Sequence, residues 1–258
     1  MTDGYGRKIE YLRMSVTDAC NLKCVYCMPP DGMKECPCRQ AMSADEFVEI
    51  ARAAAGLGMK KLRITGGEPL VRDDIVPLVR RLGEIPGIED MSLTTNATLL
   101  APMARELYEA GIHRINISLD TLNAEKYEKI TRGGHLADAL DGIRAALEAG
   151  MSPVKLNTVL IGGFNDDEIE ALAALTMRCP VQLRFIELMP IGDTKGEFSA
   201  DAYLPVGTVL DRLPQLEPAP GERHAVARLY KLPDAEGKIG LISPLSNHFC
   251  AECNRLRL

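Results

Sequence analysis

Residues 11–27 read YLRMSVTDACNLKCVYC, an apolar run followed directly by three cysteines. Cys20, Cys24 and Cys27 have the spacing C-x3-C-x2-C. Three close thiolates can hold a four-iron cluster and leave one iron free to bind a substrate or cofactor. The alternatives are three buried small hydrophobic side chains, or half of a zinc site completed elsewhere in the chain. Zinc sites usually combine one C-x2-C pair with another pair, so the unequal spacing favours an iron–sulfur cluster.

The apolar run is the first of six expected strands that alternate with amphipathic helices. A capping box at Ser43 and Glu46 begins the first helix, and Gly58 ends it. The other strands are expected at 61–65, 91–95, 114–119, 154–161 and 181–188, with further helices near 74–83, 102–110, 136–149 and 166–177. This alternation predicts an α/β fold, a partial (β/α)6-type TIM barrel with functional groups at the C-terminal strand ends.

The pattern changes near residue 190. A short helix is expected near 206–213, and a polar hairpin over 224–232 and 238–243. We therefore divide the chain into a partial barrel over residues 1–190 and a C-terminal α+β extension over residues 191–258. Residues 28–40 are expected to form a loop that covers the first cysteine group.

Composition excludes several classes of protein. A formal net charge of −6 argues against general nucleic-acid binding, which depends on a basic surface. No signal-peptide pattern precedes Cys20, and no apolar stretch is long enough to cross a bilayer. Eight cysteines in a chain of this length then indicate reduced thiols in the cytoplasm and not a disulfide framework.

Polar groups follow several of the expected strands. Gly66-Gly67-Glu68-Pro69 allows close approach of a ligand to the backbone, and Glu68 suits a cationic amino group. Segments 94–96 and 118–120 offer hydroxyl, amide and carboxylate groups, although such residues also cap helices. Lys155 and Asn157 share one face of a strand, and a lysine facing into the barrel requires an anionic partner. If it faces outward, Lys155 is only a solvated charge.

A second cysteine pair lies in residues 250–257, CAECNRLR. Cys250 and Cys253 can bind a metal or cluster, and Arg255 and Arg257 can hold phosphate. Half of a zinc ribbon, a redox dithiol and a pair of core cysteines are the alternatives. Outside these groups, Cys36 and Cys38 are expected to be loop thiols, and Cys179 is expected in the core.

These segments together resemble one enzyme family. Residues 13–27, 66–69 and 250–257, with Ser118 and the Glu-Leu-Met-Pro run at 187–190, are similar to the GTP 3′,8-cyclases of molybdenum-cofactor biosynthesis. These are radical S-adenosylmethionine (SAM) lyases. The three cysteines alone would identify only the radical SAM superfamily, whereas Arg13 and the C-terminal segment are specific to the cyclases.

The resemblance implies a role for each matching residue. A [4Fe-4S] cluster on Cys20, Cys24 and Cys27 would bind and cleave SAM. The residues implied in SAM binding are Tyr26, Gly67, Ser118 and Met189, and those implied in GTP binding are Arg13, Arg63, Thr94, Lys155, Arg255, Leu256 and Arg257. It also implies a flavodoxin- or ferredoxin-type electron donor, a homodimer, and transfer of the product to the next enzyme of the pterin pathway.

This sequence departs from the family pattern in two places. The family's second cluster uses Cys250, Cys253 and a third cysteine further along than Leu258, where this sequence ends. Ala97 stands where the family usually has glycine after Thr-Thr-Asn. The alternatives left open are a truncated homologue that cleaves SAM without cyclising GTP, a peptide-modifying radical SAM enzyme, and a non-enzymatic metal-binding interaction protein.

Overall fold

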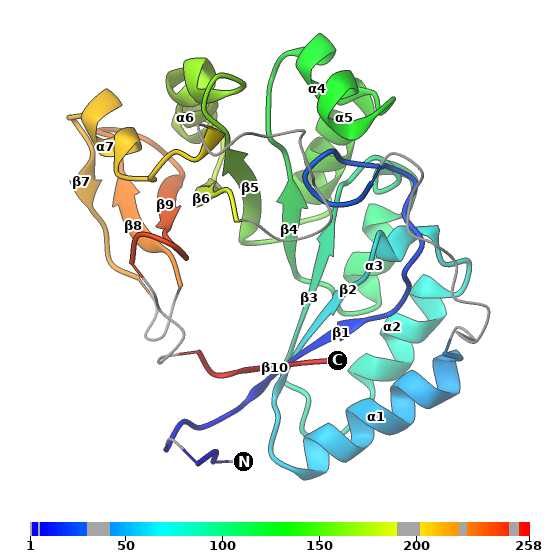
Figure 1. Cartoon of the computed structure of the whole chain (residues 1–258). Helices are drawn as coiled ribbons and strands as arrows, with labels where there is room; N and C mark the ends of the chain where they lie inside the picture. Colours follow the sequence, from blue (N-terminus) through cyan, green and yellow to red (C-terminus); the bar gives the residue numbers. More distant parts are fainter. Residues whose placement is uncertain (1, 5, 30–41, 190–201, 222–225, 248–252) are drawn as a thin grey trace.

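A computed structural model describes residues 2–4, 6–29, 42–189, 202–221, 226–247 and 253–258. It contains one sheet, in the strand order β10-β1-β2-β3-β4-β5-β6-β9-β8-β7. All six predicted strands form, as β1 (Tyr11–Ser15), β2 (Lys61–Thr65), β3 (Asp90–Thr95), β4 (Arg114–Ser118), β5 (Val154–Leu160) and β6 (Val181–Glu187). Each pairs in parallel with the next. The predicted α/β fold with a parallel sheet is confirmed (Figure 1).

Helices follow the strands, as the sequence pattern predicts. They are α1 (Ala44–Gly56), α2 (Ile75–Gly83), α3 (Ala104–Glu109), α4 (Ala124–Thr131), α5 (Leu136–Glu148), α6 (Ile169–Arg178) and α7 (Thr208–Arg212), with 3-10 turns η1 (Pro69–Val71), η2 (Ala101–Met103) and η3 (Asp166–Glu168). The capping box of α1 is present: Ser43 Oγ accepts from Glu46 N, and Glu46 Oε2 accepts from Ser43 N. The sequence analysis missed α4, a short helix that is capped by Asn123.

The two faces of the sheet differ because side chains alternate along each strand. Leu12, Leu62, Leu93, Ile115 and Leu156 are fully or almost fully buried on one face, within the hydrophobic core formed with the helices. Figure 1 shows α1, α2 and α3 along this side of the sheet. We call the opposite face the inner face. It carries mostly polar and charged side chains, and it is the face that concerns function.

The C-terminal segment extends this sheet at both edges. β9 (Lys238–Ile242) pairs in parallel with β6, and β10 (Arg255–Arg257) pairs in parallel with β1. β8 (Arg228–Lys231) pairs antiparallel with β9, which confirms the predicted hairpin, and β7 (Glu217–Pro218) follows at the edge. The division of the chain at residue 190 stays a prediction. Within the described residues, no helix is both long and apolar enough to span a bilayer.

Candidate radical SAM site

Residues 17–28, which we call the cysteine loop, follow β1 and lie against the turn after β2. Gly67 N donates to Thr17 O at 2.7 Å, and Glu68 N donates to Ala19 O at 2.8 Å. A β-carbon on Gly67 would lie 2.3 Å from Ala19 O, closer than real contacts allow. Gly67 therefore permits the backbone approach that fixes the start of the loop directly before Cys20.

The end of α4 holds the other side of the cysteine loop. Val25 N donates to Ile130 O at 2.9 Å, and Lys23 N donates to Thr131 O at 3.1 Å. Arg132, in the left-handed conformation at φ 55°, donates from Nη1 to Lys23 O at 3.0 Å and to Met28 O at 2.9 Å. The missed helix is thus part of the framework of the site. Its capping residue Asn123 before a short amphipathic stretch was the signal that could have identified it.

Tyr26 connects the cysteine loop to β4 and β5. Its hydroxyl donates to Asp120 Oδ2 at 2.5 Å, and Asp120 Oδ1 accepts from Val159 N at 2.8 Å. Burial raises the pKa of Asp120 to about 6, against the opposing effect of these two hydrogen bonds. Burial also raises the pKa of Tyr26 well above its usual value, so the phenol stays protonated and acts as the hydrogen-bond donor.

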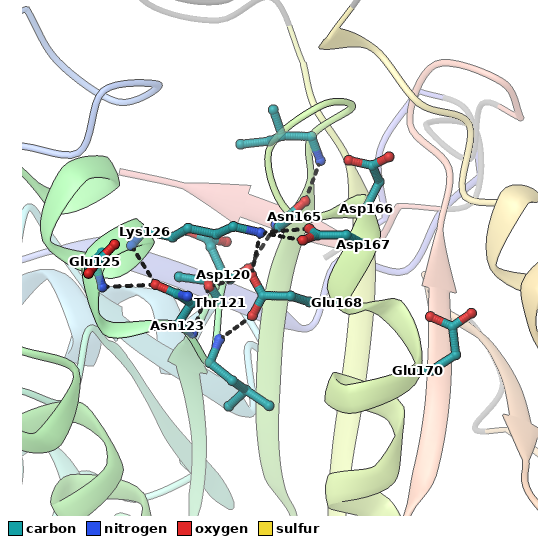
Figure 2. A network of polar contacts seen from close by, with 12 residues as sticks. Asp120, Thr121, Asn123, Glu125, Lys126, Asn165, Asp166, Asp167, Glu168 and Glu170 are labelled. Carbon is teal, nitrogen blue, oxygen red and sulfur yellow. Dashed lines mark hydrogen bonds and ion pairs between the residues drawn. The ribbon is translucent and has the colours of Figure 1, made fainter.

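A polar network behind Asp120 joins the loops after β4 and β5 (Figure 2). Asn165 Nδ2 donates to Asp120 O at 2.7 Å, and Thr121 Oγ1 donates to Glu168 Oε1 at 2.7 Å. Lys126 Nζ lies 2.6 Å from Asp167 Oδ1 and 3.0 Å from Glu168 Oε1. The carboxylates of Asp120, Asp167 and Glu168 are therefore already occupied by partners, and the network has a structural role.

The three cysteines are free thiols on the cysteine loop. Cys20 and Cys24 are half-buried, and Cys27 is exposed. Burial raises the pKa of all three, and that of Cys24 to about 12, so they bind a metal group only with release of their protons. Among the described residues, no three His, Cys, Asp or Glu side chains are grouped tightly enough to hold one ion. A cluster receives each thiolate on a different iron, so separated thiols fit it better than they fit zinc.

Glu68 has a structural role that the sequence analysis did not predict. Its side chain is buried, and its two oxygens accept from Leu70 N at 3.0 Å, Thr95 Oγ1 at 2.7 Å and Asn96 N at 2.7 Å. These bonds fasten the turn after β2 to the end of β3. These three hydrogen bonds give Glu68 a structural role, and the contact of its carboxylate with a cationic amino group of a ligand stays a prediction.

Four arginines gather on the inner face of β10, β1 and β2, and we call them the arginine wall. They are Arg13, Arg63, Arg255 and Arg257, and Arg13 is in register with both Arg63 and Arg257. Arg63 and Arg255 lie over the Tyr11 ring, with guanidinium carbons 5.2 and 5.4 Å from its centroid. The pKa of Arg13 and of Arg63 is lowered, first by burial and also by neighbouring arginines. None of the four forms an ion pair with a described carboxylate, so the arginine wall is suited to an anion.

A row of polar side chains continues the inner face across the sheet. Thr94 is in register with Asn116, and Asn116 with Lys155. Lys155 is only 8% exposed, so it faces into the fold and is not a solvated surface charge. Ser118 is in register with Asn157 one step nearer the strand ends. Two buried amide oxygens of this face, Asn116 Oδ1 and Asn157 Oδ1, have no hydrogen-bond partner among the described residues.

The remaining predicted site residues divide into three groups. Leu256 lies on the opposite face of β10 from Arg255 and Arg257, so its main chain is the part of the residue that can contact a ligand on the inner face, and its role in GTP binding stays a prediction. Met189 is exposed after β6, and Cys253 is half-buried before β10. Cys250, Cys36 and Cys38 lie outside the described residues.

Comparison with known proteins identifies the family. The Radical SAM superfamily profile matches residues 14–176, and the profile Molybdenum Cofactor Synthesis C matches residues 181–258. The chain is 52% identical over its whole length to a GTP 3′,8-cyclase of Pelotomaculum thermopropionicum, of which it covers 81%. It is 51% identical to that of Peptoclostridium acidaminophilum and 48% identical to that of Listeria monocytogenes, again over the whole chain, and covers 80% and 79% of these proteins.

Solved structures agree on the fold. Streptococcus suis SuiB bound to S-adenosylmethionine has a TM-score of 0.67 at 18% identity, covering 91% of this chain and 51% of that chain. Methylornithine synthase has a TM-score of 0.57 at 18% identity, covering 73% of this chain and 56% of that chain. The fold is thus the partial barrel of the radical SAM enzymes, and its cofactors are a [4Fe-4S] cluster and SAM. With full-length relatives at about half identity, the chain belongs to the GTP 3′,8-cyclase family of radical SAM enzymes.

Proposed function

We propose that this protein converts GTP to (8S)-3′,8-cyclo-7,8-dihydro-GTP, the first step of molybdenum-cofactor biosynthesis. The reaction joins ribose C3′ to guanine C8. The observation that carries the proposal is the arginine wall, because four guanidinium groups without a described carboxylate partner lie on the strands next to the cysteine loop. A nucleoside triphosphate supplies the negative charge that these groups lack.

The residues of the cysteine loop hold and orient the cofactors in this proposal. Cys20, Cys24 and Cys27 would ligate a [4Fe-4S] cluster which, with SAM bound to it, supplies the one-electron chemistry that removes the 3′ hydrogen atom of the ribose. Tyr26, Gly67, Ser118 and Met189 would contact SAM. The bond from Tyr26 to Asp120 fixes the aromatic ring, and Gly67 is exposed, so its backbone is accessible to a ligand.

The inner face would bind the substrate. Arg13, Arg63, Arg255 and Arg257 would neutralise the triphosphate, with Thr94 and Lys155 from the neighbouring strands and the main chain of Leu256. Because these side chains stand on strands, they hold the nucleotide in one orientation relative to the cysteine loop. Cys250 and Cys253 would take part in a second cluster.

The setting of the reaction follows from the same proposal. The three free thiols require a reducing compartment, so we place the protein in the cytoplasm. Reduction of the cluster requires a low-potential donor of the flavodoxin or ferredoxin type. We expect a homodimer that passes its product to the next enzyme of the pterin pathway.

The test is anaerobic reconstitution of the chain, followed by iron counting and assays for 5′-deoxyadenosine and cyclised GTP. We expect both products from the wild-type protein and neither from Cys24→Ala, which removes one thiolate of the first cluster. Cys179→Ala is the matched control, because Cys179 lies at the end of α6 outside the site, and it should keep both products. Deoxyadenosine without cyclised GTP would contradict the proposed reaction, and activity of Cys24→Ala would contradict the cluster assignment.

Lys155→Ala separates substrate binding from SAM cleavage. The affinity for GTP should fall about tenfold, because one buried cation of the site is lost, while SAM cleavage without GTP continues. Equilibrium binding of GTP measures the first effect, and deoxyadenosine formation the second. An unchanged GTP affinity would remove Lys155 from the substrate site.

A further inference from the structure

Asn116 is a buried inner-face residue to which the family resemblance assigns no role. It stands in the middle of β4, is 2% exposed, and is in register with Thr94 on β3 and Lys155 on β5. Its Nδ2 donates to Leu93 O at 3.2 Å, which fixes the orientation of the amide. Its Oδ1 has no hydrogen-bond partner among the described residues. The sheet thus holds a buried acceptor between two residues of the proposed substrate site.

An unsatisfied buried oxygen destabilises a fold, and an apolar side chain of similar shape would avoid that cost. The neighbouring residues Ile115 and Ile117 have such side chains, but they face the hydrophobic core on the opposite side of the sheet. The contacts of β4 therefore account for the amide nitrogen, which bonds to Leu93 O, but they give no partner for the oxygen among the described residues. A ligand that donates a hydrogen bond to Oδ1 would satisfy this oxygen.

The chemistry of the nucleotide limits which of its groups can be that donor. A triphosphate at neutral pH carries acceptors and no useful donors, so its place is at the arginine wall. The donors of GTP are the ribose hydroxyls and the guanine N–H groups. Asn116 lies two residues before Ser118 on the same face of β4, the residue proposed to contact SAM. The reaction requires the ribose C3′ to lie next to SAM, so the ribose is the part of the substrate nearest to this row.

We propose that Asn116 Oδ1 accepts a hydrogen bond from a ribose hydroxyl of the substrate nucleotide and makes the site selective for ribonucleotides. This inference rests on the proposed function, since it needs GTP in the barrel. A neutral amide suits the task better than a carboxylate, because it accepts the bond without repelling the triphosphate. A site built to bind a hydroxyl rejects the analogue that lacks it, because the buried acceptor then stays unpaired.

The test compares the binding of GTP, 2′-deoxy-GTP and 3′-deoxy-GTP by calorimetry to the reconstituted wild-type protein and to Asn116→Leu. The wild type should bind one of the two deoxynucleotides about ten- to a hundred-fold more weakly than GTP. Asn116→Leu should bind GTP as weakly as that deoxynucleotide, and the difference between the two ligands should disappear. Asn116→Ala should give the same pattern and so controls for the bulk of leucine.

The melting temperature without nucleotide separates this role from a structural one. It should change little in Asn116→Leu, because removal of the unsatisfied oxygen offsets loss of the hydrogen bond from Nδ2 to Leu93 O, whereas a purely structural amide would lower the melting temperature on removal. The inference would be overturned if both variants still discriminated against the deoxynucleotide. It would also be overturned if the variants lost discrimination against inosine triphosphate instead, because that ligand lacks the guanine amino group and reports a contact to the base. Failure of the wild-type protein to bind GTP at all would instead overturn the proposed function.

Discussion

The arginine wall and the cysteine loop lie next to one another and are stabilised in opposite ways. The arginine wall stands on regular strands, yet its charges lack described carboxylate partners, and burial lowers the pKa of Arg13 and Arg63. The cysteine loop has no regular secondary structure, yet hydrogen bonds hold it from the turn after β2, from the end of α4 and from Asp120.

The difference indicates what holds the side chains of each part of the site in position. Strands position the arginine wall without help, so its charge can be left for a ligand to neutralise. A loop has no such support. Its backbone and side-chain polar groups must form hydrogen bonds within the protein before the loop can hold its thiols in fixed positions. A substitution in the cysteine loop framework should therefore damage the fold and the cluster together, whereas one in the arginine wall should damage binding alone.

The largest expected effect is that of Gly67→Ala. The new methyl group would meet Ala19 O and displace the cysteine loop, so we expect a loss of about 3 kcal/mol or more in unfolding free energy and little iron after reconstitution. Urea unfolding measures the unfolding free energy, and iron counting measures the cluster content. Gly56→Ala is the control, since no atom lies within 4 Å of its added carbon, and it should be neutral or slightly stabilising. Normal iron content in Gly67→Ala would show that the loop does not depend on this approach.

The next effect concerns pH. The Asp120 pKa is about 6 in the fold, against an ordinary value of 3.8, so the folded protein holds this proton more tightly than the unfolded chain. The contribution of Asp120 to stability should therefore be fully present below about pH 4 and should fall by about 3 kcal/mol as the pH rises through about 6. Asp120→Asn should remove this part of the slope.

Urea unfolding of the cluster-free protein across this pH range measures the difference between wild type and Asp120→Asn. Asp74→Asn serves as a control with the opposite sign, because the hydrogen bond from Arg72 lowers the Asp74 pKa. Parallel profiles of wild type and Asp120→Asn would contradict the assigned pKa of Asp120.

The smallest effect is expected in the arginine wall. Arg63→Met should weaken GTP binding about tenfold, with less loss at high salt, while the melting temperature without nucleotide stays unchanged or rises. The reason is that the variant removes one buried charge among like charges. Arg105→Met, an exposed residue paired with Glu109, is the control and should leave binding unchanged. A lower melting temperature with unchanged affinity would make Arg63 a structural residue.

The strands and most helices could be predicted because their signals are local. Alternation along β1 to β6 and the capping box at Ser43 need no knowledge of the rest of the chain. The same alternation puts Arg13, Arg63 and Lys155 on one face. It also puts Leu256 on the other, which the family resemblance alone did not reveal.

What could not be predicted depends on contacts between distant segments. The role of Glu68 comes from Thr95 and Asn96 on another strand, and the parallel pairing of β9 with β6 has no local signal. Ala97 adopts φ 65° where the family usually has glycine, a conformation that becomes visible only with the backbone in place. That Asn116 Oδ1 has no hydrogen-bond partner among the described residues likewise becomes evident only when its neighbours in the fold are known.

The pairing of β10 with β1 has a consequence for the order in which the site is assembled during synthesis. Arg255 and Arg257 enter the arginine wall from a segment more than 200 residues after Arg13 in the sequence. A nascent chain that has left the ribosome as far as β6 already contains the cysteine loop and the elements that fasten it, but only half of the arginine wall. The residues that hold the first cluster are thus synthesised before the arginine wall is complete.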